Sequence, residues 1–263
     1  NLFDGSFGTA QFQIGANANQ TITATTANLR TTNYGNNQVK TGAAGSGVGA
    51  GALATAQAVT GGTLTINGSA GSKDVTVVAA TSAKTIAGQI NNVSGDTNVT
   101  ASARTDVKLS FSAAGSYSLT LKSDNSTAET ITFSLGSASG DELSSAITAF
   151  NDKSSKTGVT AALSADKSGI VLSNATGNDI ALADTAVANA GTTTLQAVGA
   201  DGSTAVGSSR VLAADTTADT SIVVGQITFD SAKTFSVAQA AAGTNLLGAA
   251  GAVSTGRSAA EAR

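Results

Sequence analysis

The sequence predicts an α+β fold that is mostly β, and three observations support this prediction. Short segments alternate apolar and polar residues with a period of two, which is typical of strands with one buried face. Only two segments, each of about a dozen residues, carry apolar residues at helical spacing. The order strand, strand, helix, strand, strand then occurs twice in succession. We therefore expect an N-terminal β-hairpin, outer domains built of β-β-α-β-β modules, and a discontinuous return hairpin.

Residues 1–40 are predicted to contain the first hairpin. Ala10, Phe12 and Ile14 alternate with polar residues, as in a half-buried strand. Gly and Asn residues supply a turn, and residues 21–25 return as the second strand. The next segment, 41–62, is rich in Gly and Ala. It predicts a flexible connection, because glycine loses much backbone entropy in regular structure.

This connection contains the sequence GSGVGA at positions 45–50, a formal match to the dinucleotide-binding fingerprint. No predicted strand precedes the match, and no acidic residue lies about 20 positions further on, so it lacks the context that a nucleotide site requires. We expect no nucleotide site here.

Residues 63–114 are predicted to form the first module. Its helix has one apolar face on which Ile86 and Ile90 should be buried, and Thr81 or Ser82 is the expected N-cap. The predicted elements are strands at 63–67 and 74–78, a helix at 81–93, and strands at 98–104 and 107–112.

Residues 115–185 are predicted to form the second module in the same order. Leu143, Ile147 and Phe150 lie on one face of its helix and should be buried. The sequence NVTA at 98–101 in the first module corresponds to GVTA at 158–161 in the second. The predicted elements are strands at 117–122 and 129–135, a helix at 139–150, and strands at 158–164 and 169–174.

Residues 186–240 are predicted to be a return β segment. The stretch 183–220 is polar, with few strand signals beyond 195–198, whereas 221–229 and 233–239 alternate as a candidate hairpin. The tail, 241–263, is Ala-rich and predicts weak helix.

The composition excludes several kinds of chemistry. The 263 residues include no His, Cys, Met, Trp or Pro, which excludes Cys/His zinc sites, Ser-His-Asp triads and thiol nucleophiles. The net charge is −3 and the 14 basic residues are scattered, so a nucleic-acid partner is not expected. No apolar run approaches the roughly 20 residues of a membrane helix. We assign no catalytic, cofactor-binding or metal residue and expect no enzyme. The absence of Met leads us to interpret the chain as an internal fragment.

Three acidic groups have simpler explanations than a reactive site. Asp141 and Glu142 are adjacent, and neighbours on a helix point about 100° apart, so favourable charge at a helix start explains them better than acid–base catalysis. The segments 124–125 and 166–169 read as hairpin turns, because calcium needs more oxygen ligands than the local sequence offers.

N-glycosylation triplets begin at Asn19, Asn67, Asn92, Asn98, Asn125 and Asn174, and a chain this rich in Asn, Ser and Thr produces them by chance.

Two features resemble the bacterial flagellins. The sequence NLFDGSFGTAQFQIGANANQTI at 1–22 is similar to the segment that follows their long N-terminal helices. The two β-β-α-β-β units resemble the IN motif of flagellins and hook proteins, with its helix followed by a GVTA-type strand. Together these features cover about residues 1–182. The terminal polymerising helices of the family are missing, and the tail lacks their heptad spacing.

This resemblance implies a structural subunit of the flagellar filament, of which the chain forms the surface-exposed outer domains and 1–40 part of the inner rod domain. It implies an extracellular location after flagellar export. The implied partners are other flagellin protomers, an export chaperone, the filament cap, host antibodies and an innate immune receptor whose main binding helix is absent here. We expect no cofactor, no membrane partner and a monomeric fragment. O-linked glycans on exposed Ser or Thr fit this family, although the sequence selects no site.

Two alternatives stay open. A filament cap or hook-junction protein of the same export system shares the IN motif, whereas the sequence at 1–22 favours flagellin. A surface adhesin or glycan-binding module should expose aromatic residues for sugar stacking, and Tyr34 and Tyr117 are the only tyrosines available.

Overall fold

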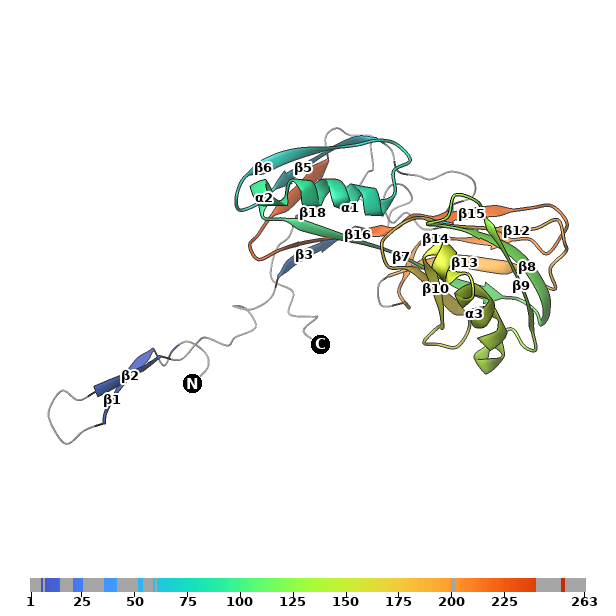
Figure 1. Cartoon of the computed structure of the whole chain (residues 1–263), viewed down its shortest axis with the longest axis horizontal. Coiled ribbons are helices and arrows are strands. Elements are labelled where there is room, and N and C mark those ends of the chain that lie inside the picture. The colour runs from blue at the N-terminus through green and yellow to red at the C-terminus, as the bar shows by residue number, and fades with distance from the viewer. Residues whose placement is uncertain are drawn as a thin grey trace.

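The computed structural model describes residues 6, 8–14, 21–25, 36–41, 52–53, 59, 61–199, 202–239 and 252–253; for 52–53 and 252–253 it describes the backbone alone. The fold is mostly β, with 49% strand and 15% helix in several antiparallel sheets, one of them curled into a half-barrel. The predicted fold class is confirmed. Figure 1 shows two neighbouring bodies. The first body comprises the described residues of 36–104 other than 52–53, together with those of 224–253. The second comprises those of 105–223 with 52–53.

The predicted N-terminal hairpin is present. Strands β1 (Thr9–Gln13) and β2 (Thr21–Thr25) pair antiparallel, with Phe12 opposite Ile22. The expectation of a half-buried strand is wrong, because Phe12 and Ile22 are both exposed. An isolated two-stranded hairpin has no second layer against which to bury an apolar face.

One long strand, β7 (Thr100–Phe111), connects the two bodies. Two strands were predicted here, at 98–104 and 107–112, and the structure corrects this. The residues between them, Thr105 and Asp106, are not a turn pair, and the strand continues through them in an extended conformation. The first half of β7 pairs with β16 (Gln226–Ser231), and its second half pairs with β11 (Ile170–Asn174) and β13 (Thr193–Val198).

In the first body, the longer helix, α1, lies between two small sheets. One sheet has the order β18-β17-β5-β6, and the other side is formed by β3, β16 and the first half of β7. Ser82 is the N-cap of the helix, as predicted, and its side chain accepts a hydrogen bond from the Thr85 N–H. The further elements are β3 (Asn37–Lys40), β5 (Gly62–Asn67), β6 (Ser72–Val77), α1 (Ala83–Asn92), α2 (Ser94–Thr97), β17 (Ser236–Gln239) and β18 (Ala252–Val253).

The core of the first body is filled from both sheets and from α1. Ile86 and Ile90 are fully buried, as predicted. They pack with Leu64 and Ile66 of β5 and with Phe229 of β16. Because β16 is far from β5 in sequence, this core holds the return segment against the start of the module.

The second body has two sheets around one apolar core. The sheet orders are β10-β11-β7-β13-β14 and β4-β15-β12-β8-β9. The further elements are β4 (Ala52–Leu53), β8 (Gly115–Lys122), β9 (Glu129–Leu135), η1 (Gly140–Leu143), α3 (Ser144–Asn151), α4 (Ser154–Thr157), β10 (Val159–Leu163), β12 (Ile180–Asp184), β14 (Ala205–Leu212) and β15 (Thr220–Val223).

Two elements cover the seams between these sheets. Helix α3 contacts both β9 and β10, the edge strands on one side. On the other side β4 pairs with β15 and contacts β14. The Gly/Ala-rich connection therefore supplies a strand where only a flexible link was predicted. Gly45 to Ala50, with the dinucleotide-like sequence, lies outside the described residues, as does the tail apart from β18.

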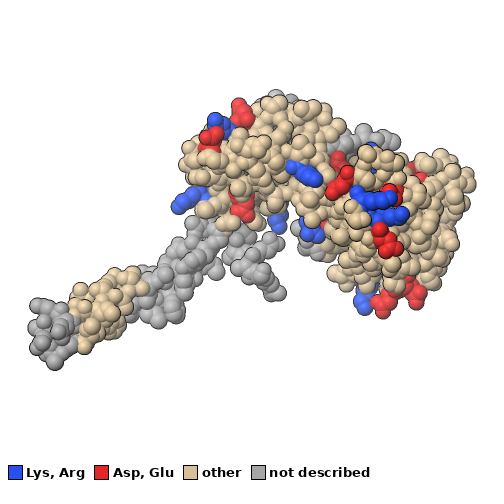
Figure 2. All heavy atoms as spheres, viewed as in Figure 1, with Lys and Arg blue, Asp and Glu red and all other residues tan. Residues whose placement is uncertain are grey.

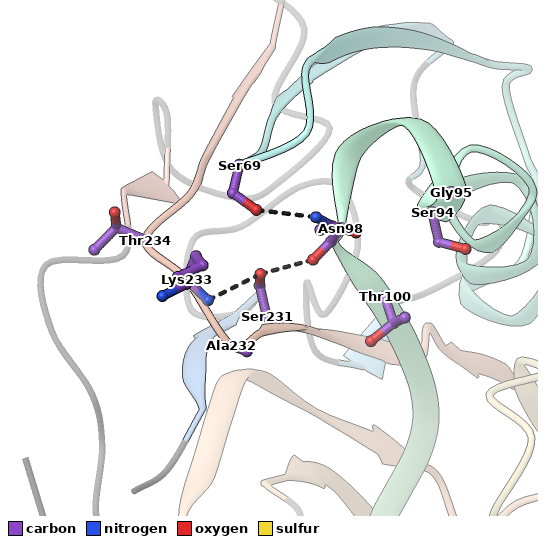
Figure 3. Close-up of a pocket in the computed structure, with 9 residues that line it drawn as sticks. All are labelled: Ser69, Ser94, Gly95, Asn98, Thr100, Ser231, Ala232, Lys233 and Thr234. Atoms are coloured by element: carbon purple, nitrogen blue, oxygen red, sulfur yellow. Dashed lines mark hydrogen bonds between the residues drawn. The ribbon is translucent and has the colours of Figure 1, made fainter. Parts of the chain in front are cut away.

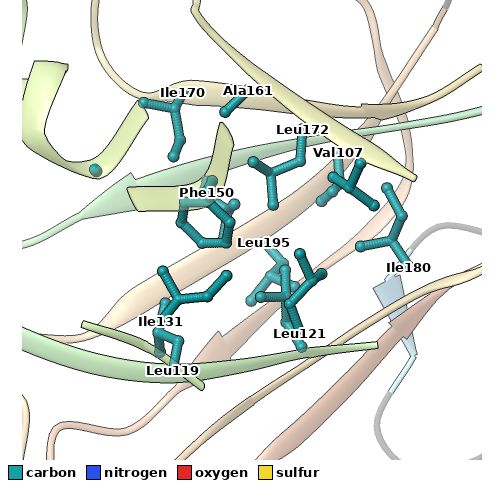
Figure 4. Close-up of a cluster of buried hydrophobic side chains, with 14 of the residues drawn as sticks. Val107, Leu119, Leu121, Ile131, Phe150, Ala161, Ile170, Leu172, Ile180 and Leu195 are labelled. Atoms are coloured by element: carbon teal, nitrogen blue, oxygen red, sulfur yellow. The ribbon is translucent and has the colours of Figure 1, made fainter. Parts of the chain in front are cut away.

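The core of the second body, shown in Figure 4, is larger, and several of its aromatic rings contact one another. Leu143 and Phe150 are fully buried, as predicted. Ile147 was predicted to be buried as well, but it is only partly buried and packs at the margin of the cluster. The helix is short and lies over a seam, so only a narrow stripe of its surface faces inward.

The return segment differs from its prediction in two ways. The polar stretch 183–220 contains all of β13 and β14 and the end of β12, although few strand signals were expected beyond 195–198. The segments 221–229 and 233–239 were predicted to pair as a hairpin, but the first is divided between the end of β15 and the start of β16. In the described chain β16 instead pairs with β3 and β7, and β17 pairs with β5 and β18. Their alternation indicated strands correctly, but it contains no information about the partner of a strand.

These pairings make the two bodies structural repeats. In the second body, β10 pairs with β11 and β8 pairs with β12. In the first body, β7 pairs with β16 and β5 pairs with β17. Strands β16 and β17 therefore occupy the places of β11 and β12, and the second body is inserted between β7 and β16 of the first.

The registers agree with this correspondence at the level of single residues. Thr100 is opposite Asp230 across β7 and β16, and its Oγ1 donates to the Asp230 carbonyl at 3.3 Å. Thr160 is opposite Ser173 across β10 and β11, and its Oγ1 donates to the Ser173 carbonyl at 3.5 Å. The two repeats thus share one register.

Candidate functional site

An asparagine at the end of each module helix binds the backbone of the following strand. The side chain of Asn91 donates to the Ala101 carbonyl and accepts from the Ala101 N–H, both at 2.8 Å. In the second body, Asn151 makes the same two bonds to Ala161, at 3.0 and 2.8 Å. We name this pair of hydrogen bonds the asparagine clamp. It joins the end of a helix to the start of a strand.

A buried threonine follows each clamp. Thr97 Oγ1 donates to the Val93 carbonyl and accepts from the Val99 N–H. Thr157 makes the same contacts with Lys153 and Val159. From 92 to 100 and from 152 to 160, the order of exposed and buried positions is identical. The NVTA and GVTA correspondence seen in the sequence is therefore a repeated three-dimensional unit.

The residue after this threonine ends the short helix in a left-handed conformation. Asn98 has φ +56° and Gly158 has φ +69°. Asn and Gly are the residues that adopt this conformation most readily, which explains why the two repeats differ in this way. The clamp, threonine and left-handed residue bind backbone groups, so this constellation stabilises structure and offers no reactive group.

A groove of about 790 Å³ lies beside Asn98 at the end of the first body. It is formed by the β5–β6 turn, α2, the start of β7 and the loop between β16 and β17, and Ser69, Thr100 and Lys233 are among its lining residues. Figure 3 shows that Asn98 contacts Ser69, and that Ser231 bridges Lys233 and Asn98. Five of the nine residues that line the groove carry a hydroxyl group, although most of the lining surface is apolar.

A second groove, of about 410 Å³, lies beside Tyr117 and Phe133 on the second body. These two rings stack at 5.5 Å between centroids. Both are buried, and the Tyr117 hydroxyl donates to the Ala113 carbonyl at 2.7 Å. Tyr117 is therefore a core residue and offers no exposed ring for sugar stacking, and Tyr34 lies outside the described residues.

The acidic residues singled out in the sequence lie in three separate places. Asp141 and Glu142 are exposed in the first turn of η1, where a helix-start role was predicted. Asp166 lies in the β10–β11 turn, where the Lys108 ammonium and the Ser164 and Ser168 hydroxyls lower the pKa of its carboxyl. Asp124 lies in the β8–β9 turn. Both turn predictions are confirmed.

A further carboxylate, Asp184, was missed in the sequence. It is buried at the end of β12 and accepts a hydrogen bond from the Asp219 N–H, while its Oδ2 has no partner among the described residues. Burial raises the pKa of this carboxyl. The period of two could have indicated it, since Asp184 shares the inward register of Ile180 and Leu182.

The described residues include acidic and basic side chains on both bodies. Among them, no group of three or more Asp or Glu residues is placed to hold a metal ion. Figure 2 shows acidic and basic side chains interspersed over both bodies on the face in view. The described helices are all too short or too polar to span a bilayer.

The geometry defines a β-rich structural module that occurs twice in one chain. Residues 63–115 match the family model of the flagellin hook IN motif. This segment runs from β5 through α1 to the end of β7 and includes the first asparagine clamp. The chain thus contains a flagellin hook IN motif, which points to flagellins or hook-associated proteins, a structural and not an enzymatic family. No curated protein matches the chain.

Proposed function

We propose that this chain is the outer, surface-exposed part of a flagellin, the subunit of the bacterial flagellar filament. The observation that carries the proposal is the IN motif at 63–115. The repetition of its clamp at Asn151 and the flagellin-like sequence at 1–22 support it. Motility would then follow from polymerisation of the full-length chain outside the cell.

We further propose that the chain divides according to this role. Residues 1–40 come from the inner rod domain, except that their last strand, β3, pairs within the first body. Residues 41–62 connect to the outer domains, and IN-type modules begin at 63 and 115. The return segment, 186–240, contributes β16 and β17, which complete the first module. Residues 241–263 form the tail, of which β18 pairs with β17 in the first body.

The surface of the bodies supports a projecting rather than a polymerising role. The module helices are short, with 10 residues in α1 and 8 in α3, and each uses its apolar face in its own body. Coiled-coil assembly requires apolar residues at heptad spacing over several heptads. The proposed partners, which are other flagellin protomers, an export chaperone and the filament cap, are therefore expected to bind sequences outside the two bodies. Host antibodies would meet the bodies themselves.

Immunogold electron microscopy tests this function. An antibody raised against the two bodies, applied to flagellated source cells, should label filaments along their entire length. Label at filament tips alone would instead support a filament cap, and label at the base of the filament would support a hook-junction protein. Label on the cell body of aflagellate mutants would contradict a flagellar role and support a surface adhesin.

A further inference from the structure

The groove at Asn98 has a counterpart in the second body. Ser69 lies in the β5–β6 turn and contacts the left-handed Asn98. Asp124 lies in the corresponding β8–β9 turn and is next to the left-handed Gly158. The turns differ in length, 68–71 in the first body and 123–128 in the second, but each places one polar side chain, Ser69 or Asp124, against the equivalent left-handed residue.

In the second body this position is filled by a carboxylate. Asp124 Oδ1 accepts hydrogen bonds from the Asn174 side chain at 2.8 Å and from the Asn178 side chain at 2.7 Å. A Cβ atom on Gly158 would lie 2.1 Å from Asp124 Oδ2, so the carboxylate occupies the space in which a side chain would begin. A side chain at position 158 would therefore have to displace the carboxylate.

In the first body both the carboxylate and its amide partner are replaced by shorter side chains. Ser69 stands in the first body where Asp124 stands in the second. Ser231 of β16 holds the register position that Asn174 holds in β11. The Ser231 hydroxyl turns to the Asn98 carbonyl at 2.6 Å. These replacements leave the groove of about 790 Å³ open, within the usual size of small-molecule sites.

The groove also gains a cation. Lys233 lies in the β16–β17 loop at its margin, and its ammonium has no carboxylate within ion-pairing distance among the described residues. Around it, Ser94, Thr100 and Thr234 add hydroxyl groups. A single ammonium beside several hydroxyls is suited to a ligand that carries one carboxylate and several hydroxyl groups.

We propose that this groove binds an acidic saccharide, whose carboxylate takes the place that Asp124 occupies in the second body. Lys233 and the Asn98 side chain would contact the carboxylate, and the surrounding serines and threonines would contact sugar hydroxyls. The site is independent of the filament role, because none of its residues lies in a polymerising helix.

Nuclear magnetic resonance titration of the whole chain with glucuronate tests the proposal. Binding on the order of millimolar is expected, because the site is open and offers one charged contact. Amide shifts should centre on Ser69, Asn98 and Lys233. Glucose tests the need for the carboxylate, and acetate tests the need for the sugar; both should bind more weakly than glucuronate.

Three variants sharpen this test. Lys233→Gln should weaken glucuronate binding about tenfold, the value of one charge-assisted contact. Ser69→Asp should abolish binding by supplying the carboxylate internally, as the second body does. Lys84→Gln, an exposed lysine elsewhere on the first body, should leave binding unchanged. A well-dispersed spectrum in each variant establishes that it is folded.

The site is supported if glucuronate binds about tenfold more weakly to Lys233→Gln, does not bind to Ser69→Asp, and binds unchanged to Lys84→Gln. The proposal is overturned if glucuronate causes no shifts, if the shifts lie elsewhere, if Lys84→Gln weakens binding equally, or if acetate binds as well as glucuronate.

Discussion

At the scale of single residues, the modules depend on backbone groups that are satisfied by side chains. Where a strand begins beside the end of a helix, one backbone N–H and one carbonyl of the strand have no backbone partner. An asparagine side chain can accept from that N–H and donate to that carbonyl. Asn91 and Asn151 meet this need in the two bodies. The position is visible in the sequence only as one Asn among many, so its role could not be predicted from composition or periodicity.

Removing a clamp should destabilise the body that contains it. Asn91→Ala leaves the Ala101 N–H, part of a nearly buried residue, without its partner and removes a second hydrogen bond. We expect a loss of about 2 kcal/mol in the free energy of unfolding, measured by urea denaturation. Asn92→Ala, at the exposed neighbouring position, should change it by less than about 0.5 kcal/mol. Equal effects of the two variants would contradict the role of the clamp.

Asp184 should make the stability depend on pH. Its pKa is raised in the folded chain, so the folded state binds this proton more tightly than the unfolded state. Its favourable contribution is complete below the unfolded pKa of about 3.9 and is lost as the pH rises through the folded pKa. Asp184→Asn should therefore raise the Tm at pH 7, and this gain should shrink toward acid pH. Asp152→Asn, at an exposed site, is the control. A Tm lowered at pH 7 would contradict this.

At the scale of elements, periodicity predicted most helices and strands but not their partners. Both module helices and the hairpin turns at 124–125 and 166–169 were predicted correctly. The single strand β7 and the separation of β16 from β17 were not, because pairing is decided by burial in the finished core rather than by local alternation. Strand β14 was missed because small polar residues are weak strand signals, whereas the signal at 195–198 had indicated β13. The groove was missed because it is assembled from two distant segments.

Helix α3 should contribute chiefly through Phe150. This side chain is fully buried in the core, whereas Ile147 lies at its margin. Phe150→Ala should cost about 3–5 kcal/mol by leaving a cavity, whereas Ile147→Ala should cost clearly less, because its site is partly open to solvent. Chemical denaturation of both variants measures this difference. Equal losses would show that Ile147 is as deeply packed as Phe150.

At the scale of the whole molecule, two copies of one module are nested, since the second body interrupts the first between β7 and β16. The shared strand β7 passes from one core to the other and fixes them to a common backbone. This arrangement fits the proposed projecting role.

The isolated chain should be a monomer. Both module helices bury their apolar faces within their own bodies. The exposed large apolar residues of the two bodies lie at separate places in the chain: Val78 after β6, Val187 after β12 and Val211 in β14. A stable interface usually buries at least about 1,000 Å² with good complementarity. Light scattering over a wide concentration range should give one mass, that of a 25.4 kDa chain. A stable dimer at micromolar concentration, or fibres, would place an assembly surface within these residues.

The most direct test of the proposed function is a helical reconstruction of flagellar filaments from the source cells by electron cryomicroscopy. Every subunit is expected to project two β-rich bodies from the filament surface. One long strand should join the two bodies, and the hairpin of residues 9–25 should lie nearest the filament axis. Filaments whose subunits lack these bodies, or bodies confined to the tip, would contradict it.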